Sequence, residues 1–515
     1  MLIGDISRRN SRRYPRKTAV VFGSTELSWA AVDERANRLG TFLLDRGFRL
    51  GDRVAVIAAN TVQWPEVTFG LAKAGLVLVP INVRLAPDEV AYILEDSGCR
   101  AAIVLGQHVE RFAGVLTGLE SVLQINGADI GTSYDDALHR GRDVDPTPDD
   151  LTPDHTQFLL YTSGTTGRPK AVVNAHRGMV AQVLDTSIVT EARHEDVLLA
   201  LTPSYTAGGM VRTLSWLFLG QTMVMHPGFD PEATIDEIER RHVSMTTFIP
   251  TMLLRILRFL EEGPQRDVSS LRRISYGSAP VPPGLAREAM SRLGCDLQQR
   301  YGLTEAGGQV TILSPADHRA MVAGATHLGE SCGRETPQAE LRVVDDDGRE
   351  VPRGEVGEIV VRADSLGRGY WNQEEATAAT FRPDGLWSGD LGRMDEEGYL
   401  YVVGRKTDMI ISGGFNVYPA ELERVIGSDP QVDLVAVVGA PHPEWGETPV
   451  AVVVPRGEPD LVALEGRLRA RCREGLAGYK QPATFDFRST LPLGPAGKIL
   501  KRELRAEYQA TGRTT

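Results

Sequence analysis

The sequence has few cysteines, and none of them forms a close pair. Only four occur among the 515 residues, with no C-x-x-C spacing. This excludes a disulfide framework and a cysteine-based zinc site, and it favours reduced thiols in a cytoplasm. Cys472 follows Leu461, Leu464 and Leu468 at helical spacing, so we expect it to pack in a core.

Long apolar runs are also absent. The most apolar window, LVLVPI at residues 76–81, is far too short to span a bilayer. The N-terminal segment MLIGDISRRNSRRYPRK is basic but lacks the long apolar stretch of a signal peptide. We therefore expect a soluble, cytoplasmic protein with no membrane span.

The sequence has no excess of positive charge. Its formal net charge is -12, whereas a protein that coats nucleic acid needs a basic surface. This argues against nucleic acid as a partner, although a local basic pocket could still hold a small anion. A chain of 515 residues is too long for one ordinary core, so we expect two or more domains.

Short apolar runs alternate with helical patterns from about residue 18 to residue 295. This alternation predicts an α/β architecture with largely parallel sheets. The predicted strands are 18–22, 53–58, 101–105, 158–162, 197–201, 222–226 and 245–249, and the predicted helices are 62–74, 87–96, 176–190, 231–241 and 283–293.

The pattern changes twice in the last third of the chain. Close-set strands and Gly-rich turns over residues 327–403 predict a small β-barrel or antiparallel sheet. A second change comes at GRKTD (404–408), where we place a domain boundary. Beyond it we expect a compact α+β unit with helices 419–427 and 460–474, strands 432–439 and 448–454, and a final basic helix.

The stretch YTSGTTGRPK (161–170) lies between the apolar runs FLLY and AVVNA, so we expect it to join two strands. Its two glycines permit close backbone approach, its hydroxyls add donors, and Lys170 adds a point charge, which suits the tail of a nucleoside triphosphate. Pro169 and Ala171 break the pattern G-x-x-x-x-G-K-[ST], which excludes a P-loop hydrolase. The alternative is an ordinary polar hairpin turn.

Four further stretches carry residues suited to nucleotide chemistry. They are YGSAP (276–280), YGLTEAGG (301–308), the SGD turn that contains Asp390, and GPAGKILKREL (494–504), which contains Lys498. Glu305 offers a hard oxygen for Mg²⁺, and Asp390 can accept bonds from ribose hydroxyls. Each also has an ordinary alternative, since Glu305 and Lys498 could be surface charges and Asp390 could stabilise its own turn.

Taken together, these motifs resemble the adenylate-forming superfamily, which includes acyl-CoA synthetases. YTSGTTGRPK, YGLTE, SGD, GRKTDMIISGGFNVYPAELE and GPAGKILKREL follow one another in the order and spacing of that family. The resemblance implies a large N-terminal part (1–403) of two α/β subdomains plus a small β-barrel. It also implies a hinge at 404–407 and a small mobile α+β C-terminal domain (408–515).

The resemblance implies that ATP and Mg²⁺ bind to the N-terminal part. Residues expected to contact ATP or AMP are Thr162, Ser163, Gly164, Thr165, Thr166, Gly167, Lys170, Gly277, Ser278, Ala279, Pro280, Tyr301, Gly302, Leu303, Thr304, Asp390, Arg405 and Lys498. Thr166 and Glu305 would lie near Mg²⁺ and, with Lys498, form the catalytic set. Lys498 would bridge the substrate carboxylate and the α-phosphate.

The resemblance also implies an acyl pocket and a path for coenzyme A. The expected acyl-binding residues are Tyr205, Thr206, Gly208, Gly209, Phe248, Pro250, Gly277 and Leu303, and the expected CoA-binding residues are Ser412, Gly413 and Gly414. The acyl set predicts a roomy, mostly apolar pocket for an alicyclic, aromatic or medium-chain acid. No cationic side chain stands out in the sequence for a second carboxylate.

Two positions depart from the family pattern. Thr206 stands where acyl-CoA synthetases often have His, and it argues against an α-amino acid as substrate. Thr407 stands at the hinge position, which is commonly Asp or Lys. We expect an ATP-dependent acid–CoA ligase that releases AMP and pyrophosphate. The alternatives are an enzyme that loads a carrier-protein thiol, a ligase specialised for preformed acyl-adenylate, and a catalytically silent nucleotide-binding protein.

Overall fold

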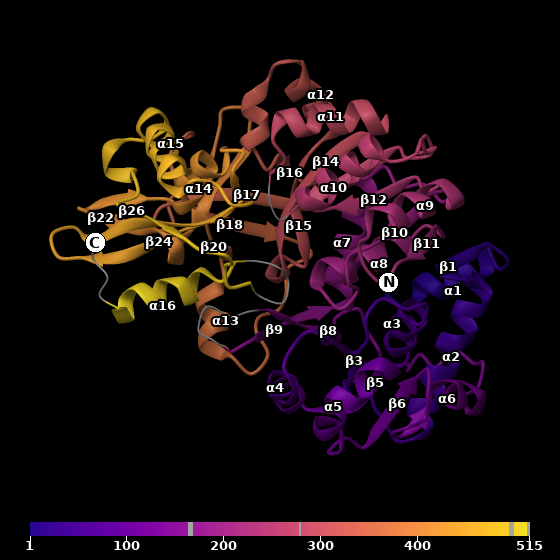
Figure 1. The fold of residues 1–515 in the computed structure, drawn as a ribbon. Helices are drawn as coiled ribbons and strands as arrows, with labels where there is room; N and C mark the ends of the chain where they lie inside the picture. Colours follow the sequence, from indigo (N-terminus) through magenta and orange to yellow (C-terminus); the bar gives the residue numbers. More distant parts are fainter. Residues whose placement is uncertain (163–167, 278–279, 494–498, 512–515) are drawn as a thin grey trace. The chain divides into compact units, whose positions relative to one another are not determined.

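The chain divides into two compact units. One comprises Met1–Arg342 and Val360–Ser388, and the other comprises Val343–Ile359 and Gly389–Thr515. The computed structural model describes residues 1–162, 168–277, 280–493 and 499–511 (Figure 1). The predicted hinge at 404–407 lies inside the second unit. The predicted division into residues 1–403 and a mobile domain of residues 408–515 therefore does not coincide with these units and stays a prediction.

The first unit contains a seven-stranded sheet. All its neighbouring strands run parallel except the last two, β8 and β9, which are antiparallel. In spatial order the strands are β7 (Thr132–Ser133), β6 (Ser121–Ile125), β5 (Cys99–Leu105), β3 (Arg53–Ile57), β4 (Val77–Pro80), β8 (Thr156–Thr162) and β9 (Lys170–Ala175).

A nine-stranded sheet follows in the same unit. Its central strands β14 to β1 are parallel, and antiparallel strands flank them at both edges. In spatial order they are β16 (Arg334–Glu335), β15 (Gly308–Leu313), β14 (Asp296–Leu303), β13 (Arg273–Gly277), β12 (Met245–Phe248), β10 (Val197–Ala200), β11 (Thr222–Met225), β1 (Thr18–Phe22) and β2 (Thr25–Ser28).

Most helices of the first unit connect strands of these two sheets, as parallel pairing requires. Several begin with proline, whose missing N–H is not needed in the first helical turn. They are α1 (Asp5–Arg13), α2 (Trp29–Asp45), α3 (Trp64–Lys73), α4 (Pro87–Ser97), α5 (Val109–Leu116), α6 (Tyr134–Arg140), α7 (His176–Val189), α8 (Ala207–Leu217), α9 (Pro231–Arg241), α10 (Pro250–Glu262), α11 (Pro283–Leu293), α12 (Pro315–Ala323) and α13 (Glu374–Thr380).

The strands of the seven-stranded sheet are buried on both faces. Along β3, Val54 and Val56 belong to one core cluster, whereas Ala55 and Ile57 belong to another. Successive side chains of a strand point to opposite faces, so helices must cover both sides. This is why the buried strands read as continuous apolar runs and could be recognised in the sequence.

The remaining strands form two five-stranded sheets. The first has the order β17 (Ala339–Val344), β18 (Gly357–Ala363), β20 (Gly385–Met394) and β19 (Phe381–Arg382), with β21 (Leu400–Arg405) also paired to β20. The second has the order β23 (Phe415–Val417), β22 (Ile410–Ser412), β25 (Gly446–Pro455) and β24 (Val432–His442), with β26 (Thr484–Phe487) paired to β25. The helices of the second unit are α14 (Pro419–Gly427), α15 (Leu461–Gly475) and α16 (Lys501–Thr511).

The predicted α/β architecture is confirmed, and so is the change to antiparallel strands after residue 327. Cys472 is buried beside Leu464 and Leu468 in the core of the second unit, as its spacing predicted. Several other elements were not predicted, among them helices α2, α8 and α10 and strands β2, β4 and β6. No helix among the described residues combines the length and the apolar character that a membrane crossing requires.

Candidate active site

The two ends of the stretch 161–170 are held together by strand pairing. Strands β8 and β9 are antiparallel neighbours, and their last aligned pair is Thr162 with Lys170. The Thr162 hydroxyl lies 3.4 Å from the Lys170 carbonyl oxygen, to which it donates. The predicted strand–loop–strand arrangement is therefore confirmed. The predicted phosphate-binding residues Ser163, Gly164, Thr165, Thr166 and Gly167 lie outside the described residues.

Lys170, Tyr370 and Glu305 form a cluster beside this loop. The Lys170 ammonium lies 5.4 Å from the centre of the Tyr370 ring, within cation–π range. The Tyr370 hydroxyl donates a hydrogen bond of 2.8 Å to Oε1 of Glu305. The structure thus brings together two predicted site residues that are far apart in the sequence. Tyr370 was not predicted, and its only sequence signal is an aromatic residue in the glycine-rich stretch GRGYWN.

A short backbone segment, residues 365–371, fixes this cluster. It runs along β9, where Trp371 N donates to Ala171 O at 2.8 Å. The same segment reaches the 3₁₀ turn Thr304–Ala306, where Gly367 N donates to Glu305 O at 2.9 Å. Strand β9, which begins at Lys170, and the Glu305 turn are therefore joined through this segment by main-chain hydrogen bonds, which limits how far Lys170 and Glu305 can move apart.

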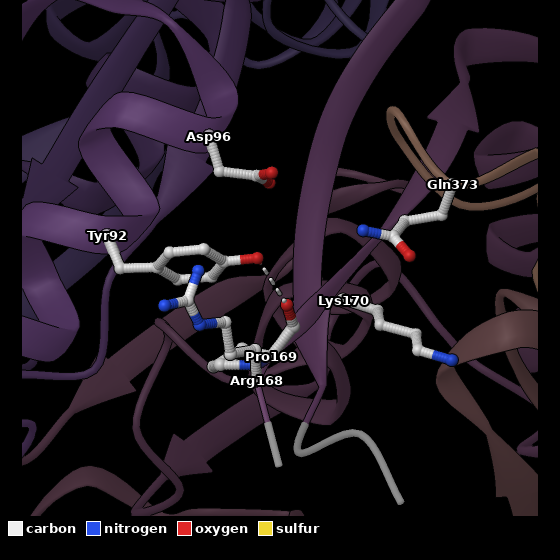
Figure 2. Close-up of a pocket in the computed structure, with 6 residues that line it drawn as sticks. All are labelled: Tyr92, Asp96, Arg168, Pro169, Lys170 and Gln373. Atoms are coloured by element: carbon white, nitrogen blue, oxygen red, sulfur yellow. Dashed lines mark hydrogen bonds between the residues drawn. The ribbon is translucent and has the colours of Figure 1, made fainter. Parts of the chain in front are cut away.

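A pocket of about 400 Å³ opens beside the end of the loop (Figure 2). Arg168 and Lys170 contribute positive charge to it, and Asp96 contributes negative charge. The Arg168 guanidinium lies 5.2 Å from the Tyr92 ring centre, and the Tyr92 hydroxyl donates to Pro169 O at 3.4 Å (Figure 2). The sequence did not predict this pocket, which consists of Tyr92, Asp96, Arg168, Pro169, Lys170 and Gln373.

The predicted adenine-framing segments lie at the carboxyl ends of two adjacent parallel strands. Gly277 ends β13 and is paired in register with Arg300 on β14. A side chain at Gly302 would stand 2.1 Å from the Gly308 carbonyl oxygen, so the close approach of β14 and β15 requires glycine there. Tyr301 and Leu303 are the neighbours of Gly302 on β14, and Thr304 begins the 3₁₀ turn that follows. Pro280 is exposed, and Ser278 and Ala279 lie outside the described residues.

Four of the predicted acyl-binding residues, Tyr205, Thr206, Gly208 and Gly209, lie at the beginning of helix α8. Thr206 is the N-cap: its hydroxyl accepts from Gly209 N at 3.0 Å and donates to Pro203 O at 2.9 Å. This capping role explains why threonine suits a position where the family often has histidine. Tyr205 is buried, and burial raises the pKa of its phenol.

Phe248 and Pro250 lie where β12 ends and α10 begins. Phe248 is paired in register with Tyr276, so its side chain is on the face of the sheet opposite to Thr247 and Gly277. It packs edge-on against Phe229, with ring centres 6.3 Å apart. The structure therefore does not bring Phe248 to the same face as Gly277, and its contact with substrate stays a prediction.

Asp390 and Arg405 are partners in the second unit. They are directly opposite each other on β20 and β21, and Arg405 Nε lies 2.7 Å from Asp390 Oδ1. The Asp390 side chain is buried, whereas Arg405 is half exposed. The two residues predicted to hold ribose are therefore brought together by strand register.

The predicted hinge residue Thr407 lies in the 3₁₀ turn Lys406–Asp408. Lys406 bonds to Asp346 at 2.7 Å and to Glu358 at 3.0 Å, and these contacts, the Asp346 bond above all, raise its pKa. Arg505 of α16 donates to the Thr407 carbonyl oxygen at 2.8 Å. Within the second unit the turn is thus held on both sides by charged side chains.

The predicted CoA-binding stretch forms a tight hairpin between β22 and β23. Ser412 pairs with Phe415, leaving Gly413 and Gly414 as the two turn residues, with φ of +58° and +81°. Positive φ at both central residues is what a two-residue type I′ turn requires. The two glycines are therefore explained by the turn itself, and their contact with CoA stays a prediction.

Lys498 lies outside the described residues. Within the described part of the chain, no group of three or more His, Cys, Asp or Glu side chains could hold a metal ion. Glu305 is thus the one predicted metal-binding carboxylate that the structure locates.

Comparison with known proteins identifies the family. A model described as "AMP-binding enzyme" matches residues 7–371, and one described as "AMP-binding enzyme C-terminal domain" matches residues 421–498. The chain belongs to the AMP-binding enzyme family, which confirms the resemblance found in its motifs.

Similar proteins match the chain over nearly its whole length. The feruloyl-CoA synthase of an Amycolatopsis species is 37% identical over 505 residues, covering 97% of this chain and 98% of that protein. The fatty acid–[acyl-carrier-protein] ligase ScoC of Streptomyces coeruleorubidus is 34% identical over 507 residues, covering 97% and 95%. The crystal structure of the anthranilate CoA ligase AuaEII in complex with anthranoyl-AMP has a TM-score of 0.88 at 28% identity, covering 99% and 98%.

The contact between Tyr370 and Glu305 gives a prediction. Tyr370→Phe removes a hydrogen bond to a charged group, an interaction of about 1.5–3 kcal/mol. If Glu305 helps to hold Mg²⁺, the Mg²⁺ concentration for half-maximal activity should rise roughly ten-fold, as a magnesium titration of the initial rate would show.

Tyr508→Phe is the matched control, because Tyr508 also donates to a carboxylate, Asp486, at a place with no predicted catalytic role. An unchanged magnesium requirement in Tyr370→Phe would contradict this role for Tyr370.

Proposed function

We propose that this chain is an ATP-dependent acid–CoA ligase. In the first step a substrate carboxylate oxygen attacks the α-phosphate of ATP, and the bond to pyrophosphate breaks. In the second step the CoA thiolate attacks the acyl carbon, and AMP leaves. The observation that carries the proposal is the Lys170–Tyr370–Glu305 cluster, which places a cation and a carboxylate beside the family's phosphate loop.

The relatives support the class of reaction. The feruloyl-CoA synthase and the anthranilate CoA ligase are named for joining an aromatic acid to CoA. This favours an apolar aromatic, alicyclic or medium-chain acid as substrate. The predicted acyl residues Tyr205, Gly208 and Gly209 offer an aromatic wall and two positions without side chains, which is consistent with such an acid.

The first step must bring two anions together, so positioning and charge neutralisation matter more than proton transfer. We propose that residues 162–170 hold the β- and γ-phosphates, with Lys170 as their fixed cation. We also propose that Asp390 and Arg405 hold the ribose. Their ion pair supports this role, because strand register brings the two groups together at one place.

Glu305 suits a magnesium ion that is shared with ATP. Mg²⁺ commonly takes one or two protein carboxylates and fills its other positions with phosphate oxygens and water. The Tyr370 hydroxyl donates to Oε1 of Glu305 and thereby orients the carboxylate. When bound, Mg²⁺ would neutralise phosphate charge, and Glu305 and Thr166 would hold it.

The second step needs a path for a thiol. We propose that Ser412, Gly413 and Gly414 flank the pantetheine arm after residues 408–515 turn about the hinge that contains Thr407. A tight glycine turn leaves room for a slender thiol arm. We also propose a cytoplasmic location, which suits the four cysteines, all described and none in a disulfide.

A panel of carboxylic acids tests the function directly. Each acid is incubated with ATP and Mg²⁺, and with either CoA or a phosphopantetheinylated carrier protein, while pyrophosphate, AMP and thioester are measured. We expect acid-dependent pyrophosphate release and an acyl-CoA product. Acyl transfer only to the carrier protein would favour the ScoC-like alternative. Thioester formation only from synthetic acyl-AMP would indicate a specialised second step, and no turnover with any acid would refute the ligase.

Lys498 gives a second prediction. Lys498→Ala should lower the rate of acyl-adenylate formation roughly 10²–10³-fold, because it removes one electrostatic contact to the reacting groups. ATP–pyrophosphate exchange measures this step. Lys480→Ala serves as the control, since Lys480 pairs with Glu421 and has no predicted catalytic role. Unchanged exchange in Lys498→Ala would overturn the assignment.

A further inference from the structure

Two arginines that the sequence did not single out lie beside the predicted acyl residues. Arg212 is on α8, four residues after Gly208. Helix side chains lean toward the N-terminus, and the Arg212 guanidinium lies over Gly208. Its Nη2 is 3.4 Å from the point where a Cβ on Gly208 would stand. The guanidinium therefore reaches back toward the N-cap segment that contains Tyr205 and Thr206.

Arg300 approaches from the sheet. It is on β14 and is paired in register with Gly277 on β13. Its guanidinium extends across β13 and donates from Nη2 to the Thr247 hydroxyl of β12 at 3.0 Å. Gly277, Thr247 and Arg300 are on one face of the sheet, and Gly277 has no side chain to block this path.

Helix α8 packs on the face of the sheet that carries Thr247, because its Met210 and Leu214 share a core cluster with Met245, two residues before Thr247 on β12. The two guanidiniums are therefore on the same face. Burial, together with the positive charge of Arg300, lowers the pKa of Arg212 to about 9. Burial also lowers the pKa of Arg300 to about 10. Both groups still carry their charge at neutral pH, so two like charges share one partly buried region.

No carboxylate of the described residues forms an ion pair with either group. Other arginines of the same unit that extend into the protein do have such partners: Arg35 with Glu66, Arg272 with Asp196 and Arg273 with Glu191. Removing a cation from water without a counter-ion is costly. The pair Arg212–Arg300 is therefore suited to an anion that arrives with a ligand.

We propose that Arg212 and Arg300 bind a second, distal anionic group of the substrate, so that the preferred acid is a dicarboxylic acid whose aromatic, alicyclic or medium-chain body between the two carboxylates is apolar. This inference rests on the proposed ligase function. One carboxylate reacts with ATP, and the other is held by the arginine pair at the far side of the acyl site. Arg212 lies over Gly208, and Arg300 is paired in register with Gly277; both glycines are predicted acyl residues, which favours the acyl group as the partner of the pair.

Matched pairs of acids test the proposal. The probes are linear α,ω-dicarboxylic acids from succinic to sebacic acid and terephthalic acid, each beside its own monomethyl ester. The ester keeps the length and shape of the acid but removes the distal charge. Acid-dependent pyrophosphate release gives kcat/KM for each. We expect kcat/KM of at least one diacid to exceed that of its ester roughly ten-fold or more. The ester leaves the buried guanidiniums without a counter-ion, and a buried charged group without a partner weakens binding strongly.

Variants then link this preference to the two arginines. Arg212→Gln and Arg300→Gln should each lower the diacid-to-ester ratio of kcat/KM at least ten-fold, mainly through KM of the diacid. Arg212→Lys and Arg300→Lys keep the charge and should retain part of the preference, which separates recognition from misfolding. Arg258→Gln, which removes an exposed charge on α10, should leave the ratio unchanged.

The outcomes are distinguishable. Esters or monocarboxylic acids that equal or exceed every diacid would overturn the arginine proposal while leaving the ligase function intact. A ratio that does not change in Arg212→Gln and Arg300→Gln would overturn it as well, and a raised KM for ATP alone would assign the pair to phosphate. No pyrophosphate release with any acid, charged at one end or at both, would refute the ligase and the arginine proposal together.

Discussion

A carboxylate and a triphosphate repel each other, and a ligase that joins them must overcome this repulsion. Two like charges 4 Å apart repel by about 4 kcal/mol near a protein surface, where the effective dielectric constant is about 20. The chain as a whole is acidic, with a net charge of -12. Positive charge must therefore be placed locally. The structure places it at Lys170 at the end of the predicted phosphate loop, at Arg405 in the second unit, and at Arg212 and Arg300 beside predicted acyl residues.

Rigid backbone holds the first of these sites. Strand register brings Thr162 opposite Lys170, and residues 365–371 connect the same strand to the Glu305 turn by main-chain hydrogen bonds. Groups that are fixed before the substrate arrives need no reorganisation during the reaction, which is where electrostatic catalysis gains most. The Tyr370 hydroxyl completes this frame, because it orients the carboxylate that we propose as a magnesium ligand.

The sequence predicted well those elements that can be identified from the pattern of neighbouring residues alone. Strands β1, β3 and β8 contain continuous apolar runs because they are buried on both faces, and Cys472 follows a helical period. Tyr370, Arg212 and Arg300 could not be predicted in this way. Their importance comes from what lies beside them: Glu305, Gly208 and Thr247 are their neighbours only after the sheet has formed. The presence of Thr206, where the family often has histidine, is likewise explained only by its capping hydrogen bonds in the structure.

The central claim is that a substrate carboxylate attacks the α-phosphate of ATP. Isotope transfer tests it most directly. An accepted acid labelled with ¹⁸O in both oxygens of the reacting carboxylate is converted in the presence of ATP and CoA, and the products are analysed by mass spectrometry. The account predicts one ¹⁸O atom in AMP and one retained in the thioester. AMP without label, or label in inorganic phosphate released together with ADP, would contradict it.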